Sequence, residues 1–437
     1  MKRILFIIVD LLIIYGSILL SFYLLAEIDM LEDFQQNFEA FTIVAPFIGL
    51  FYFILMYVFE LYNLTHKEIG ELVYTVLLIS ISLMIGIMGV CFLVRDVAMA
   101  FPRSVILLST LTYFVVLTLW RALLWYVNHK LHGKKKIIII YNETNELSET
   151  IKRKCANFYQ ILYECKGKDP LLSAKIEASD EVFICSDVGQ KTREKILPIC
   201  INYKKNVCFV PKYFDVSIMS SIFYKTDDIP TFCISNMELS PEERFLKRFI
   251  DLLFGVIAVI VTFPFALITF LFVKLDGAPA FYTQERLTEG GKTFKIFKFR
   301  TMVPNAEKLS GPVLAEEKDP RITKVGKFLR MVRLDELPQL INILKGEMSI
   351  VGPRPERPFF TEQFEQELPE YHYRLKVKAG LTGLAQVEGK YNTTVEDKLR
   401  YDLIYINNYS IWKDFLIMLR TIKILFLKSS TEGIDSN

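Results

Sequence analysis

The sequence predicts a membrane protein in three parts: four N-terminal transmembrane helices, a small α/β domain, and an α-rich C-terminal domain with a re-entrant membrane helix. Its 437 residues suggest roughly three units of about 150 residues. Hydrophobic residues make up 52% of the chain, whereas soluble domains contain about 45–50% even when glycine is counted. The 23% of charged residues leaves material for a water-facing part. We place the three parts at residues 1–133, 134–240 and 241–437.

The composition also excludes several classes of protein. The 35 Phe and 21 Tyr residues exclude a disordered chain. A net charge of +3 is too small to indicate a nucleic-acid partner. The seven cysteines show no C-x-x-C spacing, which argues against a disulfide framework or a zinc site. A reduced, cytoplasmic setting fits them best.

Four apolar stretches are each long enough to cross a hydrocarbon core, which takes about 20 residues. Asp10 and Arg121 are the only charges within these stretches. Asp10 could be functional or could form a polar contact between helices. The four stretches run over Ile4–Ala26, Ala40–Phe59, Leu72–Val94 and Ser104–Val127.

The Lys/Arg bias gives the orientation of these spans. Lys2 and Arg3 precede the first span, and three lysines at 134–136 follow the fourth. The loop over Glu27–Glu39 carries five acidic residues and no base. Both ends of the four-span part are therefore expected in the cytoplasm.

A fifth apolar run, Leu252–Val273, is expected not to cross the membrane. Basic residues stand on both flanks, and residues 286–333 contain 12 bases and 5 acids. Such a segment suits an anionic inner leaflet better than translocation. The flanking bases are Arg244, Lys247, Arg248 and Lys274.

Pro264 lies near the middle of this run and removes one helical hydrogen bond. The hydroxyl of Thr262 can serve a carbonyl that is left unpaired. We predict a re-entrant helix over about 249–273 that enters the membrane, breaks at Pro264 and returns to the same face. The alternative is a fifth span with a tolerated proline.

The middle part alternates short apolar strands with polar helical stretches, as a Rossmann-like α/β domain does. Its first strand leads into residues 141–146, which contain two glutamates and no glycine. A pyrophosphate could not approach such a turn closely. We therefore favour a structural or regulatory role over dinucleotide binding. The predicted strands are Ile137–Ile140, Val182–Cys185 and Val207–Val210.

The last third carries the candidate chemistry. Residues 294–302 alternate basic and apolar side chains, as a strand does, and include Lys298 and Arg300. Asp335 and Glu336 follow Arg330 and Arg333 and are expected at the start of a helix, with Asp335 as its N-cap. Taken alone, this is mostly a capping pattern. The expected helix buries Leu337, Leu340, Ile341 and Leu344 and ends at Gly346.

Two rigid segments follow. Arg354 stands between two prolines, and a stiff arginine suits bidentate recognition of phosphate. The turn Gly380–Gln386 could bring backbone amides to an anion. The segment Ile411–Lys428 predicts an amphipathic helix on a membrane surface. Acids and arginines without usable Cys or His indicate chemistry on a diphosphate with Mg²⁺.

These motifs, in this order, resemble the bacterial sugar transferase family, the monotopic polyprenyl-phosphate phosphoglycosyl transferases of capsule and exopolysaccharide assembly. The resemblance covers about Arg244–Lys428. The upstream spans and α/β domain resemble the long form of the family. The matching segments are Lys247, Arg248 and Asp251 before the membrane helix, Pro264, Lys298–Met302, Asp335–Gln339, Pro353–Pro355 and Leu381–Gln386.

The resemblance implies transfer of a sugar 1-phosphate, a hexose 1-phosphate in our expectation, from a UDP-sugar to undecaprenyl phosphate with release of UMP. It implies Asp335 as nucleophile, Glu336 at Mg²⁺, and Arg330 as a third catalytic residue. The catalytic domain would lie on the cytoplasmic face of the bacterial inner membrane. Substrate contacts are expected from Lys298, Arg300, Arg333, Arg354, Gln386 and Asp402.

Two questions about partners stay open at this point. The sequence does not decide between a monomer and a homodimer, or whether downstream glycosyltransferases bind. The alternative from another class is a non-catalytic membrane scaffold or regulator of polysaccharide assembly.

Overall fold

The computed structural model forms two compact units, residues 1–210 and 211–437. The structure describes residues 2–29, 31, 33–61, 69–93, 101–143, 145–234, 236–275, 279–304, 319–389 and 393–425.

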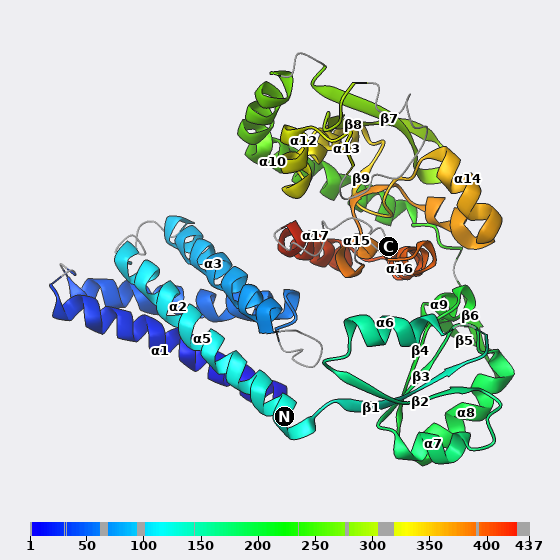
Figure 1. Ribbon diagram of the computed structural model, residues 1–437. Coiled ribbons are helices and arrows are strands. Elements are labelled where there is room, and N and C mark those ends of the chain that lie inside the picture. Colours follow the sequence, from blue (N-terminus) through cyan, green and yellow to red (C-terminus); the bar gives the residue numbers. More distant parts are fainter. Residues whose placement is uncertain are drawn as a thin grey trace. The chain divides into compact units, whose positions relative to one another are not determined.

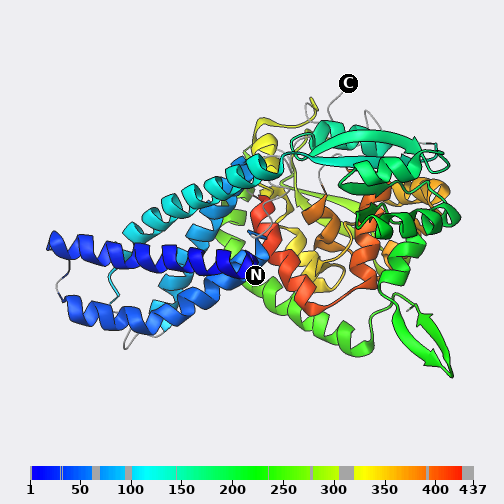
Figure 2. The same cartoon turned by 90° about the horizontal axis from the view of Figure 1, so that it is seen from below.

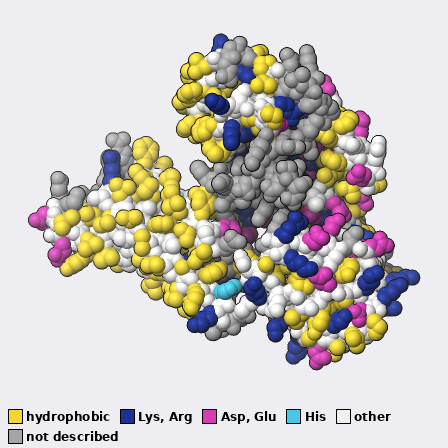
Figure 3. Space-filling model, in the orientation of Figure 1, with side chains coloured by type: hydrophobic (Ala, Val, Ile, Leu, Met, Phe, Trp, Pro, Cys, Tyr) yellow, Lys and Arg dark blue, Asp and Glu magenta, His cyan; other side chains and the backbone are white. Residues whose placement is uncertain are grey.

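The first unit begins with four long apolar helices, which confirm the four predicted helical stretches within the described residues. Each is long and apolar enough to cross a membrane. The visible face of these helices is mostly covered by hydrophobic side chains (Figure 3), as expected of a surface in contact with lipid. The helices are α1 (Lys2–Glu27), α2 (Phe34–Val58), α3 (Ile69–Leu93) and α5 (Arg103–His132) (Figure 1).

Asp10 and Arg121, the two charges within the predicted apolar stretches, form a salt bridge with both side chains fully buried. The hydroxyl of Tyr52 donates to the same Asp10 carboxylate at 2.7 Å, and Arg121 also donates to the carbonyl of Leu61. The pair therefore ties α1 to α2 and α5. Asp10 makes the helix-to-helix contact that was one of its two predicted roles.

A four-stranded parallel sheet follows, in the order β2-β1-β3-β4. Helix α6 packs on one face through Ile151, beside Ile137 and Ile139. Helices α7 and α8 pack on the other through Ile176 and Ile196, as Figure 1 shows. The three predicted strands are confirmed, and β2 was missed because it is half exposed at the sheet edge. The elements are β1 (Lys135–Tyr141), α6 (Glu146–Lys154), β2 (Tyr159–Lys166), α7 (Leu172–Ala178), β3 (Glu181–Ile184), α8 (Gln190–Asn202) and β4 (Asn206–Phe209).

The turn after β1 is closed by a side chain of the protein itself. One carboxylate oxygen of Asp187 accepts hydrogen bonds from the backbone amides of Asn142 and Glu143, at 2.9 and 2.6 Å. In a nucleotide-binding fold such amides face a phosphate. Here a carboxylate that follows β3 takes that place.

The second unit starts with α9 (Tyr213–Met219), whose Val216 packs in one cluster with Val351 and Tyr371. Residues 211–240, which the sequence assigns to the α/β domain, thus lie in the unit that contains the C-terminal third. The boundaries at 133 and 240 stay predictions. A hairpin of β5 (Ile222–Thr226) and β6 (Ile229–Cys233) follows and projects from this unit in Figure 2.

Helix α10 (Pro241–Lys274) starts at a capping box made by Ser240 and Glu243 and continues through Pro264 without interruption. The predicted break is therefore not seen in its secondary structure, and the re-entrant path stays a prediction. Thr262 donates to the carbonyl of Ala258 at 2.7 Å. The carbonyl that loses its helical donor at Pro264 is that of Ile260. The hydroxyl of Thr262 therefore bonds to a different carbonyl from the one predicted.

Short elements complete the unit around two small sheets. Strands β7 and β8 pair antiparallel, and β9 and β10 pair parallel. The predicted amphipathic helix corresponds to α17, and residues 426–428 of that prediction lie outside the described residues. The elements are β7 (Phe281–Leu287), η1 (Glu289–Gly291), β8 (Thr293–Phe299), α12 (Lys324–Met331), η2 (Leu334–Glu336), α13 (Gln339–Lys345), β9 (Ser349–Val351), α14 (Pro358–Glu367), η3 (Pro369–Lys376), β10 (Gly380–Thr382), α15 (Leu384–Glu388), α16 (Val395–Asn407) and α17 (Ile411–Leu425).

Candidate active site

Asp335 and Glu336 lie in η2, a short 3-10 turn between α12 and α13. The expectation that Asp335 caps a helix is wrong, because α13 starts only at Gln339 with Pro338 as its N-cap. Arg333 precedes the turn in the left-handed backbone conformation, with φ of 56°. A residue other than glycine adopts this conformation at a cost, so the turn is specified by its surroundings.

The phase of α13 also differs from the prediction. Leu340 and Ile343 are buried, while Ile341 is 45% exposed. The two predicted residues Leu337 and Leu344 are only partly buried. The helix ends at Gly346 as predicted, with φ of 84°. The 3-10 turn advances about 3.0 residues per turn instead of about 3.6, which shifts the face that follows.

Glu336 is held between two cations. The Nζ atom of Lys298 and the Nη2 atom of Arg354 both donate to its Oε1 atom, at 2.9 and 2.8 Å. Burial by itself would raise the pKa of Glu336, but the charges of Arg354 and Lys298 outweigh burial and hold this pKa well below its usual range. Glu336 is therefore an ionised carboxylate. Strand β8 supplies Lys298, in line with the predicted strand.

The pKa of Asp335 is shifted in the opposite direction from that of Glu336. Its side chain is buried, and burial together with the neighbouring Glu336 charge raises its pKa, against the attraction of Lys298 and Arg330. Arg330 lies on α12 and donates from Nε to the hydroxyl of Thr301 at 2.9 Å. A desolvated carboxylate close to cations is a competent nucleophile for an anionic phosphate.

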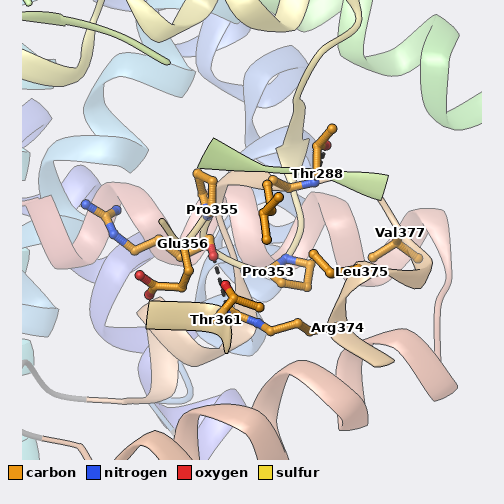
Figure 4. Close-up of a pocket in the computed structure, with 11 residues that line it drawn as sticks. Thr288, Pro353, Pro355, Glu356, Thr361, Arg374, Leu375 and Val377 are labelled. Atoms are coloured by element: carbon orange, nitrogen blue, oxygen red, sulfur yellow. Dashed lines mark hydrogen bonds between the residues drawn. The ribbon is translucent and has the colours of Figure 1, made fainter. Parts of the chain in front are cut away.

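The turn that carries Arg354 is fixed by neighbouring segments. The carbonyl of Pro353 accepts from the amide of Gly380 at 2.8 Å, and that of Arg354 accepts from Nη2 of Arg374 at 2.9 Å. The carbonyl of Glu356 accepts from the amide of Leu287 at 3.0 Å. A small pocket lies at this turn, and Arg374 is one of the residues that line it (Figure 4).

The glycines of the second predicted motif serve close contact between backbones. A Cβ atom on Gly380 would lie 2.1 Å from the amide nitrogen of Gly352, and one on Gly383 would lie 2.2 Å from the Gly352 carbonyl oxygen. The Nε2 atom of Gln386 donates back to the carbonyl of Leu381 at 3.2 Å. The contact of Gln386 with substrate stays a prediction.

Two other predicted substrate residues have partners inside the protein. Asp402 is 2% exposed and accepts from Nη2 of Arg374 at 2.8 Å. Burial raises the pKa of Asp402 to about 6. Arg300 donates to the carbonyls of Pro279, Met302 and Val273, and so secures the end of α10. Direct contact of either side chain with substrate is not supported by these bonds and stays a prediction.

Arg333 lies close to the carboxylate pair. Burial lowers its pKa, and the charges of Glu336 and Asp335 act in the opposite direction. The site thus brings together four of the predicted cationic residues around the two acids. They are Lys298, Arg330, Arg333 and Arg354.

The three charged residues predicted to precede the membrane helix all bond to the protein interior, and they are Lys247, Arg248 and Asp251. Arg248 donates to the carbonyls of Ile343 and Leu344 at 2.6 and 2.7 Å and so closes the end of α13. The carboxylate of Asp251 accepts from the hydroxyl of Ser349 and the amide of Ile350. These residues fasten α10 to the site.

Lys247 completes this attachment. Its ammonium donates to Asp414 of α17 at 2.7 Å, and to the carbonyl of Val351 and the hydroxyl of Tyr405. The sequence analysis predicted a role for Lys247 but not for Asp414, because Asp414 does not belong to a recognisable local motif.

Asn342 was also missed. Its side chain is fully buried, accepts from the amide of Phe297 at 3.0 Å and donates to the carbonyl of Lys295 at 2.8 Å. It therefore pairs with β8 as a neighbouring strand would and sets the position of Lys298 relative to Glu336. The only signal in the sequence was its position seven residues after Asp335, which places both on one side of the predicted helix.

The fold and the site define a membrane protein whose C-terminal unit holds a buried carboxylate pair among arginines and a lysine. Residues 242–428 match the model of the bacterial sugar transferase family. A Bacillus subtilis protein with the provisional name undecaprenyl-phosphate N-acetylgalactosaminyl 1-phosphate transferase is 49% identical over 131 residues, which are 30% of this chain and 73% of that protein. The chain belongs to the bacterial sugar transferase family.

Two longer relatives match as well. The UDP-N-acetylgalactosamine-undecaprenyl-phosphate N-acetylgalactosaminephosphotransferase of Aeromonas hydrophila is 43% identical over 188 residues, 42% of this chain. The undecaprenyl-phosphate galactose phosphotransferase of Salmonella typhimurium is 33% identical over 254 residues, 54% of this chain. The matches span 44% and 52% of these two relatives, about half their length.

Proposed function

We propose that the protein transfers a sugar 1-phosphate from a UDP-sugar to undecaprenyl phosphate, as the first membrane step of capsule, exopolysaccharide or O-antigen assembly. The observation that carries the proposal is the pair Asp335 and Glu336, in which Glu336 is ion-paired with Lys298 and Arg354. Named relatives act on undecaprenyl phosphate with different sugars. We expect a hexose 1-phosphate to be the group transferred.

The first step is attack by a carboxylate oxygen of Asp335 on the β-phosphorus of the donor. A bond forms from the Asp335 oxygen to this phosphorus, and the bond from phosphorus to the bridging oxygen breaks. UMP leaves with that electron pair, and an aspartyl phosphosugar remains. Because the pKa of Asp335 is raised, its carboxylate is more basic than that of an ordinary aspartate. A more basic carboxylate is a stronger nucleophile.

In the second step a phosphate oxygen of undecaprenyl phosphate attacks the same phosphorus. The bond to Asp335 breaks, the carboxylate is restored, and a polyprenyl diphosphate sugar is formed. One phosphoanhydride replaces another, so the overall change in free energy is close to zero. Arg354, Arg333 and Lys298 would neutralise the charge on the transferring phosphoryl group, which is the main demand of such chemistry.

Mg²⁺ fits this site as an ion whose coordination the substrate completes. Glu336 would hold it, beside Asp335. Asp335 and Glu336 are adjacent carboxyls in η2, and Mg²⁺ binds through one or two carboxylates plus phosphate oxygens. When bound, Mg²⁺ would neutralise phosphate charge.

The attachments of α10 support a re-entrant path and a catalytic unit on one face of the membrane. Lys247 and Arg248 fasten the start of the helix. Val273 at its end is 1% exposed and packs against Phe299 and Leu329. Both ends of α10 therefore contact the same unit, whereas the ends of a crossing helix reach opposite faces of the membrane. We assign this face to the cytoplasm because Lys and Arg flank both ends of the helix.

The middle part would be a Rossmann-like domain with a structural or regulatory role. The amides of its first turn are bonded to Asp187, which supports a role other than nucleotide binding. Whether the protein forms a homodimer or binds downstream glycosyltransferases is left to experiment.

The test is UMP release from a panel of UDP-sugars by purified protein with undecaprenyl phosphate and Mg²⁺. We expect one or a few hexose donors to release UMP, EDTA to stop the release and added Mg²⁺ to restore it. A scaffold would release no UMP with any donor. Full activity in EDTA would remove Glu336 from its proposed role at Mg²⁺.

A further inference from the structure

Arg374 lies directly behind the candidate active site, in η3. Its side chain is 7% exposed, and its guanidinium makes three contacts, with the Asp402 carboxylate, the Tyr371 hydroxyl and the Arg354 carbonyl. Burial opposes its charge, but Asp402 and Tyr371 outweigh burial and raise its pKa. A buried charge with this many partners is held in one position.

The Nη2 atom of Arg374 bonds to two groups at once. It donates to the backbone carbonyl of Arg354 at 2.9 Å and to Oδ2 of Asp402 at 2.8 Å. The side chain of Arg354 extends from the same residue and reaches Glu336 at 2.8 Å. Asp402, Arg374, Arg354 and Glu336 therefore form one connected chain from α16 to η2.

Other bonds to the Arg354 turn come from backbone amides. The amide of Gly380 bonds to the carbonyl of Pro353, and that of Leu287 bonds to the carbonyl of Glu356. Arg374 is the side chain that bonds to the carbonyl between these two. Without the Arg374 side chain, the turn would still be bonded at Pro353 and Glu356. It would have lost the bond at Arg354, whose side chain bonds to Glu336.

We propose that Arg374, oriented by Asp402, is a positioning residue that holds Arg354 against Glu336. Arg374 acts through Arg354 and touches no reacting group. Asp402, predicted from the sequence to contact substrate, serves the reaction through Arg374. The kinetic part of this inference rests on the proposed function.

The first test needs no activity. Phenylglyoxal modification of Arg354, followed by peptide mass spectrometry, reports how firmly its guanidinium is held. We expect Arg354 to react severalfold faster in Arg374→Met than in wild type. Arg400→Met is the control, because Arg400 also bonds a backbone carbonyl and carboxylates, at Pro211, Glu396 and Asp397, without contact to Arg354. Equal rates in wild type and Arg374→Met would overturn the inference.

The second test is a double-mutant cycle on UMP release. We expect Arg374→Met to lower kcat/KM by about 100-fold, the loss that a displacement of about 1 Å can cause. The double variant with Arg354→Met should be no worse than Arg354→Met alone, because both act through one guanidinium. Additive losses would contradict the inference. A wild type that releases no UMP contradicts the proposed function, while the modification test still decides on Arg374.

Arg374→Met leaves Asp402 buried without its cation and could impair folding. The pair variant Arg374→Met/Asp402→Leu avoids this, because apolar replacement of a buried ion pair is often neutral in stability. We expect it to unfold near the wild-type temperature, yet to show fast Arg354 modification and low kcat/KM. A folded pair variant with wild-type values of both would also refute the positioning role.

Discussion

Asp335 and Glu336 are adjacent in the chain, yet their surroundings act on the two carboxyls in opposite directions. Lys298 and Arg354 bond directly to Glu336 and keep it ionised. Asp335 experiences mainly burial and its neighbour's negative charge, and its pKa rises. Two carboxyls with diverging pKa values indicate two roles, which in the proposed reaction are a nucleophile and a charged partner for cations.

The raised pKa of Asp335 predicts how stability depends on pH. A buried carboxyl with a raised pKa costs stability as pH rises from its unfolded pKa of about 4 through its folded pKa. Asp335→Asn removes this cost, so its unfolding temperature minus that of the wild type should increase from pH 5 to pH 8.

Asp319 provides a control of opposite sign. A hydrogen bond from Arg321 lowers the pKa of Asp319, so Asp319→Asn should be less stable than the wild type by a similar amount at pH 5 and at pH 8, because both lie above the unfolded pKa of about 4. Thermal unfolding in detergent at both pH values measures each variant. If Asp335→Asn became less stable than the wild type as pH rises, Asp335 would instead be stabilised in its charged form.

At the scale of elements, α10 is attached to its unit by buried polar groups. Lys247 and Asp414 are 2.7 Å apart, with side chains 7% and 4% exposed. Lys247→Met leaves Asp414 buried without its cation, which should cost about 3–5 kcal/mol. Thermal unfolding and limited proteolysis should both report this loss.

Lys376→Met is the matched control. Lys376 pairs with Glu238 at 3.1 Å on the surface, with side chains 37% and 44% exposed. Exposed pairs contribute about 0–1 kcal/mol, so this variant should unfold near the wild type. Equal losses in the two variants would show that Lys247 does not anchor α10.

The sequence predicted elements better than it predicted contacts. Apolar length gave the four N-terminal helices, and alternation gave β8 with Lys298, because both signals are local. The face of α13 was misplaced because the preceding 3-10 turn has a different pitch. Arg374 lies 28 residues from Asp402 and Lys247 lies 167 from Asp414. Periodicity carries no information about such distant pairs.

At the scale of the whole molecule, the account requires the catalytic unit to stay on the cytoplasmic face although α10 is long enough to cross. A single cysteine at Lys292, after η1, in a background without native cysteines should react with a membrane-impermeant maleimide only after the cells are permeabilised. A cysteine at Gln35, in the exposed first turn of α2, should react before permeabilisation. Labelling of both positions in intact cells would mean that α10 crosses the membrane.

The central claim is that Asp335 forms a covalent bond to the transferred group, and intact-protein mass spectrometry tests it most directly. The protein is incubated with Mg²⁺ and the UDP-sugar that gives UMP release, without undecaprenyl phosphate. The account predicts one added sugar phosphate on the wild type, removed when undecaprenyl phosphate is supplied, and none on Asp335→Asn. An adduct of the same mass on folded Asp335→Asn would show that another residue is the nucleophile.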